Sequence, residues 1–242
     1  MNDTYTLLTG GSSGIGAATC ERLLAAGHRV ISLDRTPGTF TSPSLQQVQV
    51  DLSDNRATAA TAHDLAEQYP ITTVIHNAGA VRQQALENVT EEDYQTLANL
   101  HIAAPIALVQ AVLPAMRARH FGRIVLVSSR AVLGLAQRTA YSATKAAMLG
   151  LARTWALELG PDGITANVIA PGPIEATAVF HEIIPKDSPR IPAIVQSIPV
   201  KRLGLPEDVA RAILFFVAPE AGFITGQTLF VCGGTSVGSI VY

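Results

Sequence analysis

The sequence predicts an α/β fold in which a doubly wound parallel sheet of about seven strands is covered by helices on both faces. Three observations support this prediction. Short apolar β-rich runs alternate with stretches of helical periodicity, no repeat with a period of about 20 to 50 residues is present, and the helical stretches have lengths that suit right-handed crossovers. Because the alternation continues along the chain, we expect one domain over residues 1–242.

Each expected strand is a short apolar run, as strands buried on both faces of a parallel sheet are. In chain order they are Tyr5–Thr9, Arg29–Asp34, Gln46–Val50, Thr73–Asn77, Arg123–Ser128, Thr165–Ala170 and Thr228–Val231. Helix starts are expected at Thr90, which precedes three acidic residues, and at Pro206. Residues from about 173 to 205 break the alternation with prolines and apolar side chains, so we expect a substrate-covering loop there, with subunit contacts as the alternative.

Composition argues against several classes of partner. The 242 residues are 48% hydrophobic, and 17 basic against 19 acidic residues give a net charge of -2. This balance leaves no electrostatic footprint for nucleic acid or an anionic membrane, and we expect neither as a partner. Cys20 and Cys232 are too distant in sequence for a disulfide framework, and the histidines lack paired ligand spacing, so no metal is expected. Without a signal peptide or an apolar run of about 18 residues, the expected location is cytoplasmic.

The turn after the first expected strand, Thr9 to Gly16, has the glycines of a phosphate-binding loop. Glycines allow the backbone to turn tightly and lie against a pyrophosphate, which then sits at the positive end of the following helix. A tight strand-to-helix turn without a ligand is the alternative. The residues expected to contact the cofactor here are Gly10, Ser12, Ser13, Gly14, Ile15 and Gly16.

The end of the second expected strand selects the cofactor. Asp34 lies 18 residues after Gly16, where a carboxylate accepts hydrogen bonds from both adenosine ribose hydroxyls and repels a 2′-phosphate. Arg35 could bind that phosphate if Asp34 turned aside. We therefore expect NAD, with NADP as the alternative.

Tyr141 and Lys145 stand four residues apart at the start of a helical run, which puts them on one helix face. A nearby cation lowers the pKa of a phenol from its usual value of about 10, so that Tyr141 can exchange a proton with an alcohol or a carbonyl. A solvated pair is the alternative. Ser128, Ser129 and the Asn77-Ala78-Gly79 turn end other strands at the same carboxyl edge, which favours a catalytic site.

Together these motifs resemble those of the short-chain dehydrogenase/reductase family, in its short single-domain subgroup, over essentially the whole sequence. The resemblance implies a Rossmann-type fold and hydride transfer between a nicotinamide and the substrate carbon. It implies that Tyr141 is the general acid/base, that Lys145 holds the nicotinamide ribose and lowers the pKa of Tyr141, and that Ser129 binds the reacting oxygen. Further cofactor contacts are implied for Asp51, Leu52, Asn77, Ala78, Gly79, Pro171, Gly172, Ile174 and Thr177.

The sequence departs from the family pattern at several positions. Ser129 precedes Tyr141 by 12 residues, one fewer than usual, so Ser128 is the alternative. His101 stands where the family has a catalytic Asn. A neutral imidazole there could bridge a backbone carbonyl and a water, preserve a proton relay from Lys145, and titrate near neutral pH; a core histidine with Asn99 as the substitute is the alternative.

Three smaller departures accompany these. His76 replaces a second Asn and is expected to line the cofactor side of the sheet. Ala176 stands where a Thr is usual, with Thr177 next to it, and Cys232 replaces a common Asp as a small buried residue.

The expected substrate is a small, mostly apolar secondary alcohol or its ketone, held by an apolar pocket at 131–134 and 179–184. An NADPH-dependent 3-oxoacyl reductase is the alternative, which would need Arg35 and a basic patch for an acidic carrier; a non-catalytic dinucleotide sensor is a further one. By the family resemblance, helices at 104–116 and 140–159 are expected to form a homotetramer, or otherwise a dimer.

Overall fold

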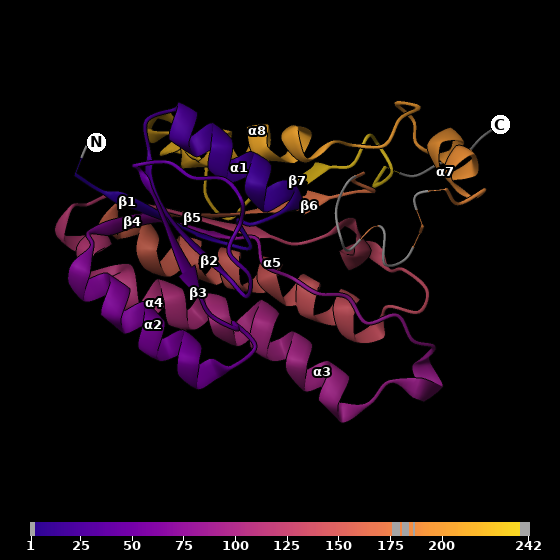
Figure 1. Ribbon diagram of the computed structural model, residues 1–242, viewed down its shortest axis with the longest axis horizontal. Helices are drawn as coiled ribbons and strands as arrows, with labels where there is room; N and C mark the ends of the chain where they lie inside the picture. Colours follow the sequence, from indigo (N-terminus) through magenta and orange to yellow (C-terminus); the bar gives the residue numbers. More distant parts are fainter. Residues whose placement is uncertain (1–2, 176–179, 181–183, 186, 238–242) are drawn as a thin grey trace.

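A parallel sheet of seven strands, in the order β3-β2-β1-β4-β5-β6-β7, forms the centre of the computed structural model (Figure 1). The structure describes residues 3–175, 180, 184–185 and 187–237. The strands are β1 (Tyr5–Thr9), β2 (Arg29–Asp34), β3 (Leu45–Gln49), β4 (Ile71–His76), β5 (Gly122–Val127), β6 (Ile164–Pro171) and β7 (Thr228–Val231). All neighbouring strands pair in parallel, which confirms the predicted fold class.

The bounds of β1, β2 and β7 are as predicted, whereas β3 to β6 differ from the prediction by one or two residues at an end. The difference at β4 matters for the site, because the strand ends at His76 and leaves Asn77 outside it. The amide of Asn77 donates to the side-chain oxygen of Thr9 at 3.0 Å, which draws the chain out of the strand. Similarly β5 ends at Val127, before the two serines.

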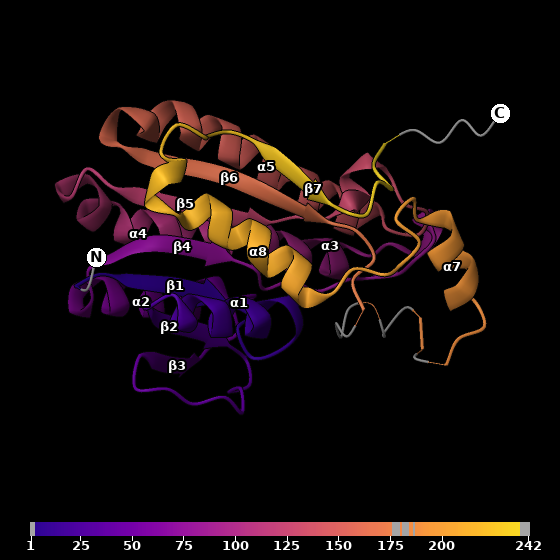
Figure 2. The same ribbon diagram turned by 90° about the horizontal axis from the view of Figure 1, so that it is seen from above.

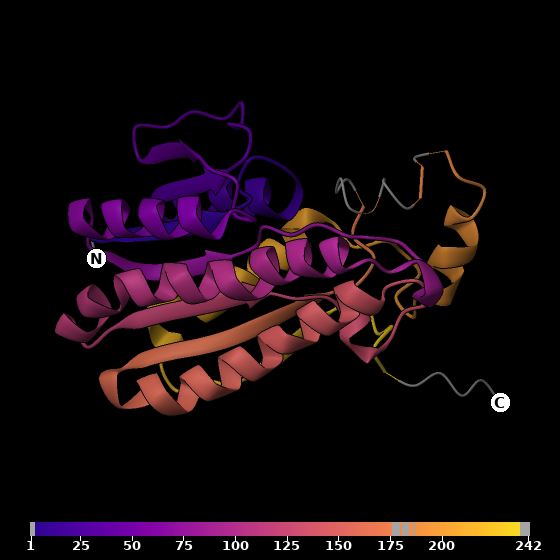
Figure 3. The same cartoon turned by 90° about the horizontal axis from the view of Figure 1, so that it is seen from below.

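Helices cover both faces of the sheet (Figures 1 and 3). α1 (Gly14–Ala25) and α8 (Pro206–Val217) pack together on one face, and α2 (Asn55–Gln68), α4 (Ala104–Ala118) and α5 (Thr139–Leu159) cover the other. The side-chain oxygen of Thr90 accepts from the amide of Asp93 at the start of α3 (Glu91–Ala98), and Pro206 opens α8, so both predicted helix starts are confirmed.

α3, a π-helical turn (Asn99–Ala103) and α4 form one continuous helix. Contrary to the expectation from sequence, the span Glu91–Ala118 is long and apolar enough to cross a membrane by length and composition alone. Its apolar side chains have another use here, because Leu108, Val112 and Met116 are fully buried in the core against the sheet. The core therefore accounts for part of the apolar surface of this helix, since 39% of its most apolar window is buried.

The chain changes direction across the sheet between β1 and β4, which are neighbours in space. In doubly wound sheets a crevice opens at such a switch point, outside the carboxyl ends of the strands. Gly10 after β1, Asn77 after β4 and Ser128 after β5 all lie at this edge, so the fold brings the predicted motifs together.

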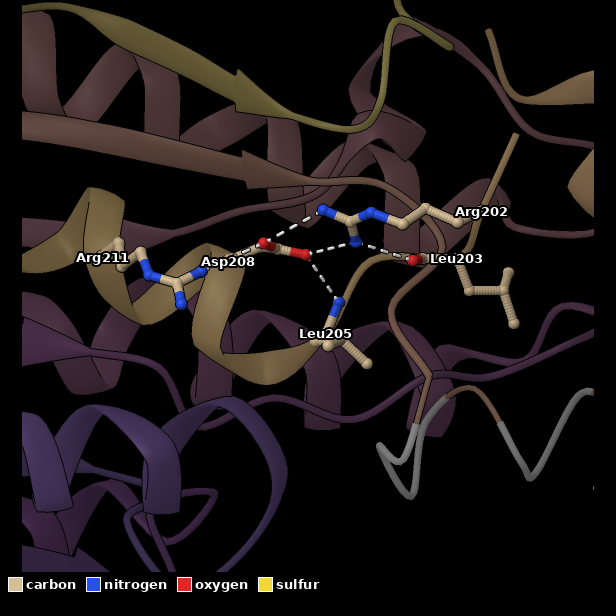
Figure 4. Close-up of polar contacts among 5 residues, drawn as sticks. All are labelled: Arg202, Leu203, Leu205, Asp208 and Arg211. Carbon is tan, nitrogen blue, oxygen red and sulfur yellow. Dashed lines mark hydrogen bonds and ion pairs between the residues drawn. The ribbon is translucent and has the colours of Figure 1, made fainter. Parts of the chain in front are cut away.

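The described part of the predicted loop is folded back onto the sheet at both ends. Ile174 and Gly204 form a β-bridge, and α7 (Ile191–Ser197) lies beyond the end of the sheet (Figure 2). Close to Gly204, the carboxylate of Asp208 receives the amide of Leu205 at 2.9 Å and the guanidinium of Arg202 at 2.6 Å, with Arg211 at 3.3 Å (Figure 4). These contacts fix where the loop returns to α8, and the Arg202 hydrogen bond holds the pKa of Asp208 below its usual value.

Candidate active site

A cavity of about 1040 Å³ opens at the carboxyl edge of the sheet. Its wall combines the turn after β1, the ends of β2, β4 and β5, the start of α5, the turn after β6 and described residues of the loop. Most of the predicted site residues line it: Gly10, Ser13, Gly14, Ile15, Asp34, Arg35, Asp51, Leu52, Asn77, Ala78, Gly79, Ser129, Tyr141, Lys145, Pro171, Gly172 and Ile174.

Ser12 and Gly16 were predicted to contact the cofactor but lie outside the cavity wall. The amide of Ser12 instead donates to Asp34 at 3.1 Å. A side chain at Gly16 would collide with the carbonyl of Gly10, so this glycine makes the tight turn possible. Ser12 therefore positions Asp34, and Gly16 allows the turn after β1, while neither residue lines the cavity. Thr177, also predicted, lies outside the described residues.

The turn and the strand ends fit a dinucleotide. α1 begins at Gly14, and Ser13 before it is extended and does not cap the helix with its side chain, so the first amides of the helix are left for a ligand. Asp34 is held by backbone amides on both carboxylate oxygens, from Ser12 at 3.1 Å and Arg35 at 2.7 Å. Hydrogen bonds from Ser53 lower the pKa of Asp51, which keeps this second carboxylate ionised.

Thr9 and His76 join the glycine turn to the π-helical turn beneath the cavity. The hydroxyl of Thr9 accepts the amides of Asn77 and Ala78 and lies 3.1 Å from Nδ1 of His76. Nε2 of His76 lies 3.0 Å from the carbonyl oxygen of Leu100, which is free because the amide of Ala104 donates to Asn99 instead. A carbonyl only accepts, so Nε2 carries the proton and Nδ1 accepts from Thr9.

The expectation that His76 lines the cofactor side is therefore wrong. Its side chain is fully buried, and burial lowers its pKa to about 3, so the ring stays neutral and connects two backbone segments.

His101 is fully buried next to the site. Its Nε2 accepts the amide of Ala80 at 3.3 Å, and its Nδ1 lies 2.9 Å from the hydroxyl of Thr144. Thr144 gives its own proton to the carbonyl of Ala140 at 2.9 Å, so Nδ1 of His101 must be the donor. All these partners agree with one neutral tautomer.

Two expectations for His101 are corrected by these contacts. It pairs with an amide and a hydroxyl rather than with a carbonyl and a water. Its pKa lies well below the usual value because the ring is desolvated, and Lys145 and His76 act in the same direction, so it does not titrate near neutral pH. The alternative residue Asn99 is occupied elsewhere, donating to the carbonyl of Ser53 at 3.1 Å.

Lys145 is buried at the floor of the cavity, and its ammonium donates to the carbonyl of Val127 at 2.8 Å. Burial lowers its pKa to about 7. A Cβ on Gly79 would lie 3.1 Å from Nζ of Lys145 and 3.3 Å from Nε2 of His101. The absence of a side chain at Gly79 therefore leaves the space in which the lysine sits.

Tyr141 is partly buried, and burial raises the pKa of its phenol; a hydrogen bond from Ser129 and the charge of Arg138 oppose this rise. The sequence suggested that Lys145 lowers the pKa of this phenol. No such effect of Lys145 is found here, and its Nζ lies 6.0 Å from the centre of the phenol ring. Both serines line the cavity, but the buried hydroxyl of Ser128 donates to the carbonyl of Lys145 at 2.7 Å, whereas the side chain of Ser129 hydrogen-bonds to Tyr141. Between the two serines, the geometry favours Ser129 beside the reacting group.

Sequence reasoning missed part of the substrate end. Ala131, Phe180 and Ile184 of the expected apolar pocket line the cavity, but Leu133 is 56% exposed and outside its wall. Val179 and Ile183 lie outside the described residues. The missed residues are the arginines that line this end, Arg82, Arg130, Arg138 and Arg190, and the buried partner Thr144. The position of Arg138, three residues before Tyr141, was the one available signal.

A doubly wound parallel sheet with a glycine turn, an acidic residue ending β2 and a Ser, Tyr and Lys set at one edge defines a dinucleotide-dependent oxidoreductase. A sequence model described as enoyl-(acyl carrier protein) reductase matches residues 10–236. The chain belongs to the short-chain dehydrogenase/reductase family, as the sequence predicted.

Two relatives and a solved structure are similar to this chain over nearly its full length. The chain is 34% identical to (2S)-((R)-hydroxy(phenyl)methyl)succinyl-CoA dehydrogenase subunit BbsD of Thauera aromatica, covering 98% of each. It is 33% identical to the 3-oxoacyl-acyl-carrier-protein reductase MabA of Mycobacterium avium, covering 96% of this chain and 89% of the relative. A structure described as a putative NAD(P)-dependent gluconate 5-dehydrogenase from Beutenbergia cavernae, with NADP bound at low occupancy, superposes with a TM-score of 0.88 at 28% identity and 97% coverage of both.

Proposed function

We propose that the protein interconverts a secondary alcohol and its ketone with NAD(H). The observation that carries this proposal is the position of Tyr141 in one cavity with Ser129, Lys145 and the glycine turn. The nicotinamide, when bound, supplies or accepts the hydride at the substrate carbon. The residues of the chain then bind the substrate oxygen and transfer its proton.

In the direction of reduction, the hydroxyl of Ser129 holds the carbonyl oxygen and Tyr141 donates its phenolic proton to that oxygen as the alcohol forms. The phenol of Tyr141 is protonated at neutral pH because burial raises its pKa, while the hydrogen bond from Ser129 and the charge of Arg138 act in the opposite direction and favour release of the proton. Lys145, fixed against Val127, lies at the floor of the cavity, where it would hold the nicotinamide ribose of a bound cofactor. In the direction of oxidation, Tyr141 takes the proton back.

NAD is the proposed cofactor because Asp34 is held by the amides of Ser12 and Arg35. A carboxylate fixed in this way accepts from ribose hydroxyls and repels a 2′-phosphate. Arg35 lies in the cavity wall and supports NADP as the alternative, as does the NADP found in the Beutenbergia structure.

A second candidate is a 3-oxoacyl thioester reductase that uses NADPH. It is favoured by the names of the two relatives, which refer to an acyl-CoA compound and an acyl carrier protein, and by the arginines at the substrate end. A dinucleotide sensor without turnover is a weaker alternative.

The test is to follow absorbance at the nicotinamide band with NADH and NADPH separately, on cyclic, aromatic and aliphatic ketones and on acetoacetyl-CoA. Turnover with NADH is expected, and Tyr141→Phe should lower kcat by about 100- to 10,000-fold while NADH binding stays within about twofold. A strong preference for NADPH with acetoacetyl-CoA would favour the second candidate. Cofactor binding without turnover on any compound would leave only the sensor.

A further inference from the structure

The substrate end of the cavity is lined by four arginines, of which, among the described residues, only Arg82 has a carboxylate partner, Asp93. These are Arg82 after β4, Arg130 and Arg138 between β5 and α5, and Arg190 before α7, so they come from three connections of the chain. Among the described residues of the cavity wall, the acidic side chains are Asp34, the last residue of β2, and Asp51, which follows β3; both lie at the nucleotide end. Because the whole chain has more acidic than basic residues, this concentration of arginines does not reflect overall composition.

Arg138 is the buried member of this group, with 4% of its surface exposed. It immediately precedes α5; its Nη1 donates to the carbonyl of Gln137 at 2.9 Å and its Nη2 to Oε1 of Gln83 at 3.0 Å. These partners use two of the five N–H groups of a guanidinium, and Nε is buried without a partner among the described residues. Neither acceptor is charged.

A buried cation without a counter-ion costs free energy, which an incoming anion would recover. No described carboxylate forms an ion pair with Arg138, whereas Arg82 shares its charge with Asp93 at 3.4 Å. Burial also lowers the pKa of Arg138, in keeping with a desolvated charge. The chemistry of the site therefore suits a ligand with a carboxylate that accepts two parallel hydrogen bonds.

Arg138 stands just outside α5, three residues before Tyr141, and its charge acts on the phenol of Tyr141 in the same cavity. An anion bound by Arg138 would therefore lie in the cavity that holds the reacting oxygen. The exposure of the other arginines places them further out, since Arg130 is partly buried and Arg82 and Arg190 are exposed.

We propose that Arg138 binds a carboxylate of the substrate, so that the alcohol or ketone is a small hydroxy acid or oxo acid. This inference rests on the proposed function. The apolar side chains of Ala131, Phe180 and Ile184 cover the carbon chain between the two polar ends. A coenzyme A thioester is a different case, because its phosphates are separated from the thioester by a long arm and would meet the exposed arginines instead.

The experiment compares oxo acids with their neutral methyl esters. Pyruvate, acetoacetate and levulinate place the carboxylate at increasing distance from the ketone, and each is assayed beside its ester with NADH and NADPH. The wild-type protein should prefer at least one acid over its ester by about tenfold or more in kcat/KM. In Arg138→Met, kcat/KM should fall by about 10- to 100-fold for that acid and by less than about threefold for the ester. The kcat/KM of Arg138→Lys for the acid should lie between those of the wild type and Arg138→Met. Arg56→Met, at an exposed position on α2 outside the cavity wall, is the control and should match the wild type.

Two results would overturn the inference. If Arg138→Met lowered kcat/KM equally for the acid and the ester, Arg138 would act on Tyr141 or on the folding of the loop rather than on the substrate. Wild-type protein that prefers esters, or that prefers acetoacetyl-CoA with no effect of Arg138→Met, would exclude a carboxylate subsite.

A binding measurement separates this inference from the proposed function. Calorimetric titration of the same acids and esters into the complex with NAD should show acid binding that Arg138→Met loses and that Arg138→Lys partly keeps. If no compound turns over but the acid still binds in this way, the proposed function fails and the carboxylate site stands. Folding of each variant is checked by its affinity for NADH.

Discussion

The ammonium of Lys145 donates a 2.8 Å hydrogen bond to the carbonyl oxygen of Val127, the last residue of β5. The bond ties α5 to the central sheet and fixes the nitrogen at the floor of the cavity. Gly79 lies between this nitrogen and His101, since a Cβ on Gly79 would be 3.1 Å from Nζ of Lys145 and 3.3 Å from Nε2 of His101. The position of the lysine therefore depends on a closely packed pocket as well as on its spacing from Tyr141.

Gly79→Ala tests this packing. The added methyl group would lie 3.1 Å from Nζ of Lys145 and 3.3 Å from Nε2 of His101, which forces the lysine to shift. The neighbours must give by a few tenths of an ångström, and a displacement of about 1 Å in an active site can cost about 100-fold in rate, so we expect kcat to fall by about two- to tenfold, with a smaller effect on NADH affinity. Steady-state kinetics and fluorescence titration of NADH measure the two quantities.

Gly150→Ala is the matched control, since nothing lies within 4 Å of its added methyl group on α5. It should leave kcat unchanged and raise the free energy of unfolding by about 0.5 to 1 kcal/mol. A Gly79→Ala variant with wild-type kcat would show that the lysine has room to move without loss.

The buried neutral His101 predicts a pH dependence of stability. Its pKa is lowered well below 6.5 in the folded state, so between that lowered value and about 6.5 the unfolded chain binds the extra proton. The contribution of the neutral ring is therefore complete above about pH 6.5 and is lost as the pH falls below it. Chemical unfolding at pH 8 and pH 5 should show a smaller loss for His101→Asn than for the wild type.

The pKa of His76 is lowered in the same way. Because His76 is present in both proteins, the difference between their losses of stability reports on His101. Equal losses in the two proteins would contradict a neutral buried ring at this position. In activity, the acidic limb of the rate profile should be the same in both, because His101 does not titrate in that range.

The sequence predicted the sheet, its carboxyl edge and the residues that meet there, because strand ends and glycine turns are local patterns. His101, to which the register pointed, lies buried beside this edge, next to Gly79 and Thr144. The partners of His101 could not be predicted: Thr144 and the amide of Ala80 depend on how α5 and the turn after β4 pack. Arg138 was missed for a related reason, since charge patterns do not reveal that an arginine is buried and forms no ion pair with a carboxylate of the described residues.

Thr144→Val tests the hydrogen bond that selects the tautomer of His101. Valine keeps the shape of the side chain but leaves Nδ1 of His101 as a buried donor without a partner. Such a group costs about 1 to 3 kcal/mol, so the free energy of unfolding should fall by that amount at pH 8. Thr144→Ser keeps the hydroxyl, so its free energy of unfolding should fall clearly less than that of Thr144→Val. A valine variant as stable as the serine variant would rule out the Thr144 contact as the reason for the neutral tautomer.

Asp34→Ser tests the choice of cofactor. The serine removes the carboxylate that the amides of Ser12 and Arg35 hold in place, and with it the repulsion of a 2′-phosphate. We expect kcat/KM for NADH to fall by about tenfold or more and that for NADPH to rise, because the guanidinium of Arg35 can then pair with the phosphate. Adding Arg35→Ala to this variant should cancel the gain with NADPH but leave the loss with NADH, since only the phosphate depends on the guanidinium. If Asp34→Ser gains nothing with NADPH, Arg35 has no part in cofactor choice, and a wild type that already favours NADPH would place the 2′-phosphate on another residue.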